Sequence, residues 1–227
     1  MIDWKSKEIV IVGAARQGLA LARYLLLHGA RVTLNDRQPA ESLAAAQNSL
    51  SDLVQSGLPL TWVCGGHPLE LLDEADLVCV SGGVPLDLPL LAEAQARQIP
   101  LTNDSQIFMQ SVPCKVIGIT GSAGKTTTTT LVGRIAQAAV SSFDASWRVW
   151  VGGNIGSPLI SIVDEMSPAD LAVVEFSSFQ LELMDRSPQI AVVLNLTPNH
   201  LDRHGTMEAY AAAKTRILQF QDEHGVV

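Results

Sequence analysis

Residues 115–131 read KVIGITGSAGKTTTTTL, and this stretch decides the interpretation of the fold. The apolar run VIGI at 116–119 is typical of a strand buried in a parallel sheet. A glycine turn and the pair Lys125-Thr126 follow, and apolar residues at 131, 132, 135 and 136 then recur at helical spacing. Backbone N–H groups in such a turn, together with a helix N-terminus, attract anions. The order strand, glycine turn, Lys-Thr and helix therefore predicts a phosphate-binding loop.

The loop departs from the usual spacing G-x-x-x-x-G-K-[ST], because Ile119 stands where that pattern has its first glycine. The part of the pattern that remains is Gly121-x-x-Gly124, followed by the Lys-Thr pair. The alternative is an ordinary strand-to-helix turn with an exposed lysine. The strand and helix on either side favour a nucleotide site, in which Lys125 reaches the terminal phosphates and the Thr126 hydroxyl binds Mg²⁺.

Bulk composition limits the classes of protein to consider. The chain has 227 residues, of which 47% are hydrophobic, enough for one large or two modest domains. The net charge of −8 argues against nucleic acid as the main partner, although a nucleotide needs only a local positive site. The sequence has neither a secretory signal pattern nor an apolar run near the ~18 residues of a membrane span, so we expect a cytoplasmic protein without membrane contact. The cysteines Cys64, Cys79 and Cys114 form no C-x-x-C pair, and we expect no metal or nucleophile role for them.

The residues before the loop predict a first α/β unit over 1–112. Strands are expected at 8–12, 31–34, 60–63, 76–80 and 99–101, with helices after the first strand, at 40–55 and at 89–98. The turn GAARQG at 13–18 is similar to a dinucleotide fingerprint, with Ala15 in place of the central glycine. Asp36 ends the second strand, where it either binds a ribose or base or is a solvated loop acid. The unit boundary is expected near Val112-Pro113.

The residues from 113 onward predict a second α/β unit. After the loop we expect a helix to about 140, a polar connection at 141–146, strands at 147–151, 170–174 and 190–194, and a helix at 207–220. Val226-Val227 would begin another strand. Alternating strands and helices predict parallel sheets, so the fold class is α/β, with a Rossmann-like first domain and an incomplete P-loop ATPase domain after it.

Polar residues lie at or just after several predicted strand ends: Lys125, Asn154, Glu175, His200 and Lys214. The carboxyl ends of parallel strands share one crevice, so these side chains can converge. Glu175 is either a Mg²⁺ ligand or a solvated acid at the sheet edge. Taken alone, His200 is a structural or surface histidine and Lys214 a solvated helix lysine. The residues thus predict a magnesium–nucleotide site and a second ligand near Gly13 and Gly83. They do not indicate which reaction is catalysed.

Four segments together identify a family. GITGSAGKTTTTTL, VGGNIG, VVEFSSFQLE and LNLTPNHLDRHGTMEAYAAAK resemble the Mur ligases, and the resemblance covers nearly the whole chain. Within the family, SSFQLE is similar to the members that add D-glutamate to UDP-N-acetylmuramoyl-L-alanine. The resemblance implies ATP-dependent amide formation through an acyl phosphate in peptidoglycan precursor synthesis, by a monomer.

The same resemblance assigns roles to residues. It implies that the UDP moiety is bound by Arg16, Gln17, Asp36, Arg37 and Gly83, and the muramoyl part by Asn154 and Ser177. It implies that ATP is bound by Gly121, Ser122, Ala123, Gly124, Lys125, Thr126 and Thr127. It implies Mg²⁺ ligation or support by Thr126, Glu175, His200 and Lys214. The implied catalytic residues are Lys125, His200 and Lys214, the last of them carbamylated.

Three departures from the family pattern qualify these expectations. Ala123 stands where the family usually has Asn, and Gly82 where it usually has Pro. Family members are about twice as long and have a third, amino-acid-binding domain, so residues 113–227 are expected to be a truncated central domain and the chain alone to be inactive. The alternatives are a non-catalytic P-loop module, or an NAD(P)-dependent oxidoreductase, which Ala15 argues against.

Overall fold

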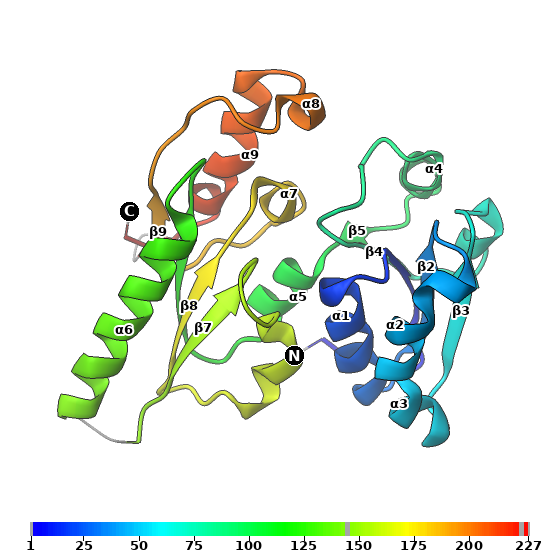
Figure 1. Ribbon diagram of the computed structural model, residues 1–227, viewed down its shortest axis with the longest axis horizontal. Coiled ribbons are helices and arrows are strands. Elements are labelled where there is room, and N and C mark those ends of the chain that lie inside the picture. Colours follow the sequence, from blue (N-terminus) through cyan, green and yellow to red (C-terminus); the bar gives the residue numbers. More distant parts are fainter. Residues whose placement is uncertain (1, 144–145, 223–224, 227) are drawn as a thin grey trace. The chain divides into compact units, whose positions relative to one another are not determined.

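The computed structural model describes residues 2–143, 146–222 and 225–226 (Figure 1). The chain divides into two compact units, Met1–Asp104 and Ser105–Val227. The division falls after Asp104, the first residue of helix α5 (Asp104–Ser111), whereas the sequence pattern placed it near Val112-Pro113. Within the described residues, no helix is long and apolar enough to cross a membrane.

The first unit is built on a five-stranded parallel sheet, as predicted. Its strands are β1 (Glu8–Val12), β2 (Arg31–Asp36), β3 (Leu60–Cys64), β4 (Leu77–Val80) and β5 (Leu101–Thr102), in the order β3-β2-β1-β4-β5. Helices α1 (Arg16–Leu27) and α4 (Pro89–Ala96) follow β1 and β4. The strand order reverses between β1 and β4, and ligands of open α/β sheets bind outside the strand ends at such a point.

The single helix predicted over 40–55 is broken into three short pieces. They are η1 (Ala40–Leu43), α2 (Ala44–Ser49) and α3 (Ser51–Gln55). Leu50 leaves the helical conformation at φ −114° and ψ 8°, and its side chain is buried. The hydroxyls of Ser49 and Ser51 donate to the carbonyl oxygens of Ala46 and Asn48, so local side-chain bonds compete with helix continuation.

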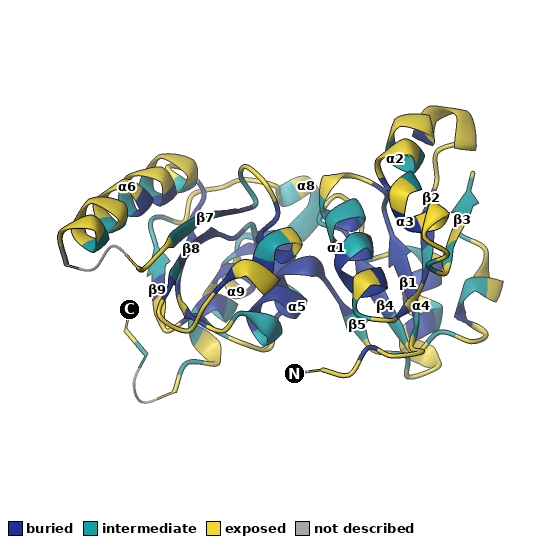
Figure 2. Ribbon diagram, turned by 90° about the horizontal axis from the view of Figure 1, so that it is seen from below, coloured by how far each residue is buried: buried dark blue, intermediate teal, exposed yellow. Residues whose placement is uncertain are grey.

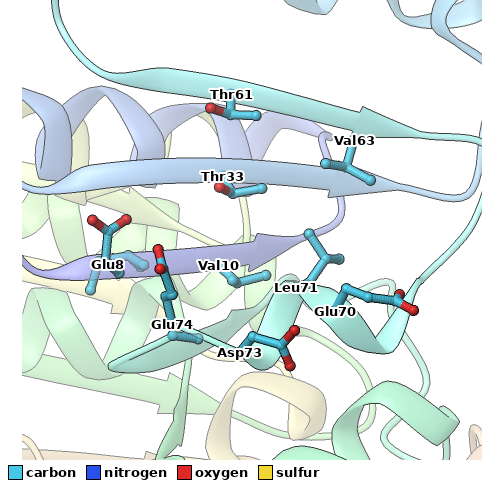
Figure 3. Close-up of a pocket in the computed structure, with 11 residues that line it drawn as sticks. Glu8, Val10, Thr33, Thr61, Val63, Glu70, Leu71, Asp73 and Glu74 are labelled. Carbon is cyan, nitrogen blue, oxygen red and sulfur yellow. The ribbon is translucent and has the colours of Figure 1, made fainter.

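One face of this sheet carries an open cavity of about 430 Å³ (Figure 3). Thr33 and Thr61 line it from neighbouring strands. The carboxylates of Glu70 and Asp73 come from η2 (Leu69–Leu72) and the residue after it. This cavity does not include the predicted ligand residues at the carboxyl ends of β1, β2 and β4.

The second unit contains a four-stranded parallel sheet in the order β7-β8-β6-β9. Its strands are β6 (Lys115–Thr120), β7 (Val149–Gly153), β8 (Leu171–Glu175) and β9 (Ile190–Val193). Helix α5 leads into this unit, and its further helices are α6 (Lys125–Phe143), η3 (Leu159–Glu165), α7 (Ser178–Leu181), α8 (Leu201–His204) and α9 (Met207–Gln219). Val226 forms a parallel bridge with Ile190, in line with the strand expected there, and Val227 lies outside the described residues. The predicted α/β class with parallel sheets is confirmed.

Helix α6 forms despite its five threonines, which are weak helix formers. The face of α6 toward the sheet packs closely against β7. Thr129 on this face is fully buried, and a Cβ on Gly133 would lie only 2.4 Å from Val151 Cγ2. Its outer face is exposed (Figure 2). The helix runs to Phe143, into the segment predicted as a polar connection, and the hydroxyls of Ser141 and Ser142 donate to carbonyl oxygens one turn back. Residues 144–145 of that segment lie outside the described residues.

Candidate functional site

The glycine loop after β6 turns directly into helix α6. Gly124 has φ +82°, a left-handed conformation that favours glycine, and α6 begins at the next residue. Asn195, two residues beyond the end of β9, holds the loop through its side chain. Its side-chain oxygen accepts from Ala123 N–H at 3.0 Å, and its amide donates to Ala123 O at 3.0 Å. Asn195 was not predicted as a site residue.

Two lysine ammonium groups meet at this loop. Lys125 Nζ donates to Gly121 O at 3.0 Å, and Lys214 Nζ donates to the same oxygen at 2.9 Å. Lys214 is only 1% exposed, because α9 packs through the face that carries Tyr210, Ala213 and Ile217. The interpretation of Lys214 as a solvated lysine is therefore wrong. Burial, reinforced by the charge of Lys125, lowers the pKa of Lys214 to about 8.

A carboxylate lies beside the loop at the end of β8. Glu175 is 1% exposed, so the alternative of a solvated edge acid is wrong. Its Oε2 accepts from the Thr126 hydroxyl at 2.9 Å, and its Oε1 accepts from the Asn154 side-chain amide at 2.9 Å. The backbone N–H of Asn154 also donates to Glu175 O at 2.9 Å. Three residues predicted from separate strand ends thus converge.

These oxygen atoms fit a magnesium ion. Mg²⁺ in nucleotide sites is held by one or two carboxylates, water and substrate phosphates rather than by an all-protein cage. The Thr126 hydroxyl donates its proton to Glu175, so its oxygen lone pairs remain available to a cation. Across the described residues, no three His, Cys, Asp or Glu side chains gather as a metal cluster.

Ser177 and His200 are placed differently from the other candidates. The Ser177 hydroxyl accepts from Gln180 N–H at 3.2 Å and caps α7, while the Gln180 side chain accepts from Ser177 N–H at 2.9 Å. His200 is exposed at φ 54°, with its ring centroid 5.1 Å from that of Phe179. In the described part of the chain, His200 has no hydrogen bond to Glu175, so the structure does not bring it to the carboxylate.

The neighbouring histidine, His204, is enclosed by the structure and makes polar contacts through both ring nitrogens. Its Nδ1 lies 3.0 Å from Glu182 Oε1, and its Nε2 lies 2.9 Å from Ser178 Oγ. Burial lowers its pKa, and the nearby Arg203 acts in the same direction. The sequence signal was the His-x-Asp-x-His spacing at 200–204.

The first unit has its own cavity of about 340 Å³ at the strand ends, which includes Asp36, Arg37 and Gly83. Asp36 is 9% exposed, with Oδ2 accepting from Ala14 N–H at 2.8 Å and Oδ1 from Gln38 N–H at 2.9 Å. It is therefore not a solvated acid, and it holds the turns that border the cavity.

Two further residues predicted for this ligand lie at the first turn of α1. Arg16 is exposed there, and Gln17 lies beside Gly82, whose added Cβ would be 3.2 Å from Gln17 Oε1. His67 also lines the cavity and was missed in the sequence.

Comparison with known proteins follows the same division of the chain. Residues 7–103 match the family described as Mur ligase MurD-like, N-terminal domain, and residues 119–227 match the Mur ligase middle domain. The UDP-N-acetylmuramoylalanine–D-glutamate ligase of Koribacter versatilis (strain Ellin345) is 42% identical over 224 residues, which is 98% of this chain and 47% of that protein. The ligase of the same name from Symbiobacterium thermophilum is 44% identical over 215 residues, 95% of this chain and 45% of that protein. The chain thus spans about half the length of these relatives.

A solved structure has the same fold. The UDP-N-acetylmuramate:L-alanyl-gamma-D-glutamyl-meso-diaminopimelate ligase from Neisseria meningitides matches with a TM-score of 0.59 and 18% identity, over 97% of this chain and 70% of that chain. At this identity the likeness concerns the fold alone.

Proposed function

Because the chain belongs to the Mur ligase family, we propose that it forms the substrate- and nucleotide-binding part of an ATP-dependent amide ligase. The proposed whole reaction joins D-glutamate to UDP-N-acetylmuramoyl-L-alanine, as the names of its relatives suggest. Residues 1–104 would bind the UDP substrate and residues 105–227 would bind ATP with Mg²⁺. The cytoplasmic location and monomeric state expected from the sequence are part of the same proposal.

One observation carries this proposal: Thr126, Asn154 and Glu175 meet beside the glycine loop through two hydrogen bonds of 2.9 Å. A strand-to-helix turn without a ligand gives no reason to bury a carboxylate next to the loop hydroxyl. Burying an ionised group is costly unless it is paired or coordinates a metal. The arrangement is therefore best explained by a cation and phosphates that join it.

In the proposed reaction, the substrate carboxylate attacks the γ-phosphorus of ATP, an acyl phosphate forms and ADP leaves. The D-glutamate amine then attacks the acyl carbon, the amide bond forms, and phosphate departs while the amine loses a proton. Lys125 would swing from Gly121 O to the transferred phosphoryl group and offset its charge, and the backbone N–H groups of the loop would orient the phosphates. Mg²⁺ held by Thr126 and Glu175 would supply further charge stabilisation when bound.

Lys214 is proposed to be carbamylated. The Lys214 ammonium would first lose a proton. The neutral amine would then attack CO₂, a nitrogen–carbon bond would form and a second proton would be released, so that a buried cation becomes an anion. A pKa of about 8 leaves a substantial fraction of the amine neutral near physiological pH. Nuclear magnetic resonance with ¹³CO₂ should show a carbamate signal in the native chain and none in Lys214→Met.

Calorimetry of the 227-residue chain tests the main proposal. We expect binding of UDP-N-acetylmuramoyl-L-alanine, and separate binding of Mg-ATP that Thr126→Val weakens without changing the UDP compound's affinity. Thr130→Val on the exposed face of α6 is the matched control and should leave both unchanged. No binding of the UDP compound to the native chain would refute the substrate assignment, and retained Mg-ATP binding would then favour a P-loop module.

A further inference from the structure

His67 is a cavity residue for which the proposed function has so far given no role. It follows β3 in the loop Gly65-Gly66-His67 and is half-buried. It lines the 340 Å³ cavity of the first unit together with Asp36 and Arg37. Its Nδ1 lies 2.5 Å from Oδ1 of Asn35, the penultimate residue of β2.

The orientation of the Asn35 amide determines which nitrogen of His67 carries the proton. Asn35 is fully buried, and its Nδ2 donates to Val63 O at 2.9 Å and to Gly66 O at 2.7 Å. Backbone carbonyls can only accept, so the amide NH₂ must face them. Oδ1 therefore faces His67, and an amide oxygen can only accept a hydrogen bond. An unprotonated Nδ1 at this distance would repel Oδ1, so Nδ1 must carry the proton. The His67 proton is thus assigned to Nδ1 by the chemistry of its neighbours.

This assignment leaves the other ring nitrogen as an acceptor. A neutral imidazole has one N–H, so with Nδ1 protonated, Nε2 presents a lone pair. Nε2 lies on the side of the ring away from Asn35, and within the described residues it has no hydrogen-bond partner. The cavity therefore offers an oriented acceptor held by a fully buried amide.

We propose that His67 is a specificity-determining residue of the UDP-substrate site, whose Nε2 accepts a hydrogen bond from an N–H or O–H donor on the nucleoside. This inference rests on the proposed function. In folds of this kind the diphosphate lies at the N-terminus of the first helix, here α1, and the ribose lies by an acid about twenty residues later, here Asp36 at the end of β2. Asp36 and His67 line the same cavity, so a nucleoside held beside Asp36 would lie near His67.

Two substitutions separate the roles of the two ring nitrogens. Asparagine places an N–H near the position of Nδ1, so His67→Asn keeps a donor for Asn35 and removes the acceptor. Glutamine places its terminal atoms near Nε2, so His67→Gln restores an acceptor there. We expect UDP to bind about tenfold more weakly to H67N and within about threefold of native to H67Q, since one hydrogen bond contributes up to about one order of magnitude. Thr61→Val, on the sheet-face cavity, is the matched control and should bind UDP as native.

Modified nucleotides identify the donor. We expect 3-methyl-UDP, 2′-deoxy-UDP or 3′-deoxy-UDP to bind the native chain more weakly than UDP and to abolish the difference between native and H67N. The 3-methyl compound would implicate the uracil N3–H, and either deoxy compound a ribose hydroxyl. If all three analogues preserve the full difference, no nucleoside donor reaches Nε2 and the inference is overturned.

Nitrogen-15 resonance of the ligand-free chain gives a readout independent of binding. In its neutral form, His67 should carry its proton on Nδ1 in the native chain. A proton on Nε2 would overturn the inference. Equal UDP affinity of native and folded H67N would overturn it while leaving the proposed function intact, whereas failure of the native chain to bind UDP and the muramoyl substrate would overturn both.

Discussion

Replacing Lys214 by methionine should remove a pH dependence of stability that the native chain shows in alkaline solution. Lys214 is 1% exposed, and its ammonium donates to Gly121 O at 2.9 Å and to Thr120 Oγ1 at 3.4 Å. Methionine has nearly the same length and no charge. Experiments in CO₂-free buffer keep the lysine unmodified.

The size of the effect follows from the lowered pKa. Burial takes the pKa of Lys214 from 10.5 to about 8, which corresponds to a cost of about 3 kcal/mol for the charged form in the native state. Between these two values the unfolded chain holds the proton and the native chain does not. Stability therefore rises with pH across this window, and the cost is fully present below about pH 8. The free energy of unfolding of the native chain relative to Lys214→Met should increase by about 2 kcal/mol between pH 7.5 and 10.

Urea titrations of both proteins, followed by circular dichroism at several pH values, measure this difference. The first unit is identical in the two proteins, so its own pH dependence cancels. Lys115→Met is the control, because Lys115 is exposed on the same sheet, and its curve should run parallel to the native one. If the native and Lys214→Met curves also run parallel within about 0.5 kcal/mol, Lys214 does not titrate as a buried amine and the reasoning about its environment is wrong.

Three other predictions concern single side chains. Gly124→Ala should destabilise the chain by about 1–2 kcal/mol in urea titrations because of its φ of +82°, whereas the neighbouring Ala123→Gly should cost less than half of that. The native chain should lose stability relative to His204→Gln as the pH falls below 6.5, since burial lowers the pKa of His204 and the unfolded chain then binds the extra proton; a pH-independent difference in urea titrations would contradict this. Burial raises the pKa of the Cys79 thiol, so mass spectrometry should find Cys79 unlabelled by iodoacetamide in the native chain while Cys64 reacts; equal labelling would argue against its burial.

Local patterns were sufficient wherever one segment specifies its own structure. The apolar runs at 8–12, 116–119 and 170–174 predicted buried parallel strands, and β1, β6 and β8 lie at these positions. The same reasoning failed over 40–55, because a helical pattern does not show that buried Leu50 and the serines beside it interrupt the helix.

The sequence by itself determined the α/β class, the position of the glycine loop before α6 and the family resemblance, because these depend on residue order along short segments. Only the tertiary structure decided the protonation and partners of the side chains. Lys214 and Glu175 become buried, His204 is enclosed while His200 is exposed, and Asn35 orients His67. Charge and tautomer depend on burial and on atoms contributed by segments distant in the chain, which the spacing of residues in a sequence does not record.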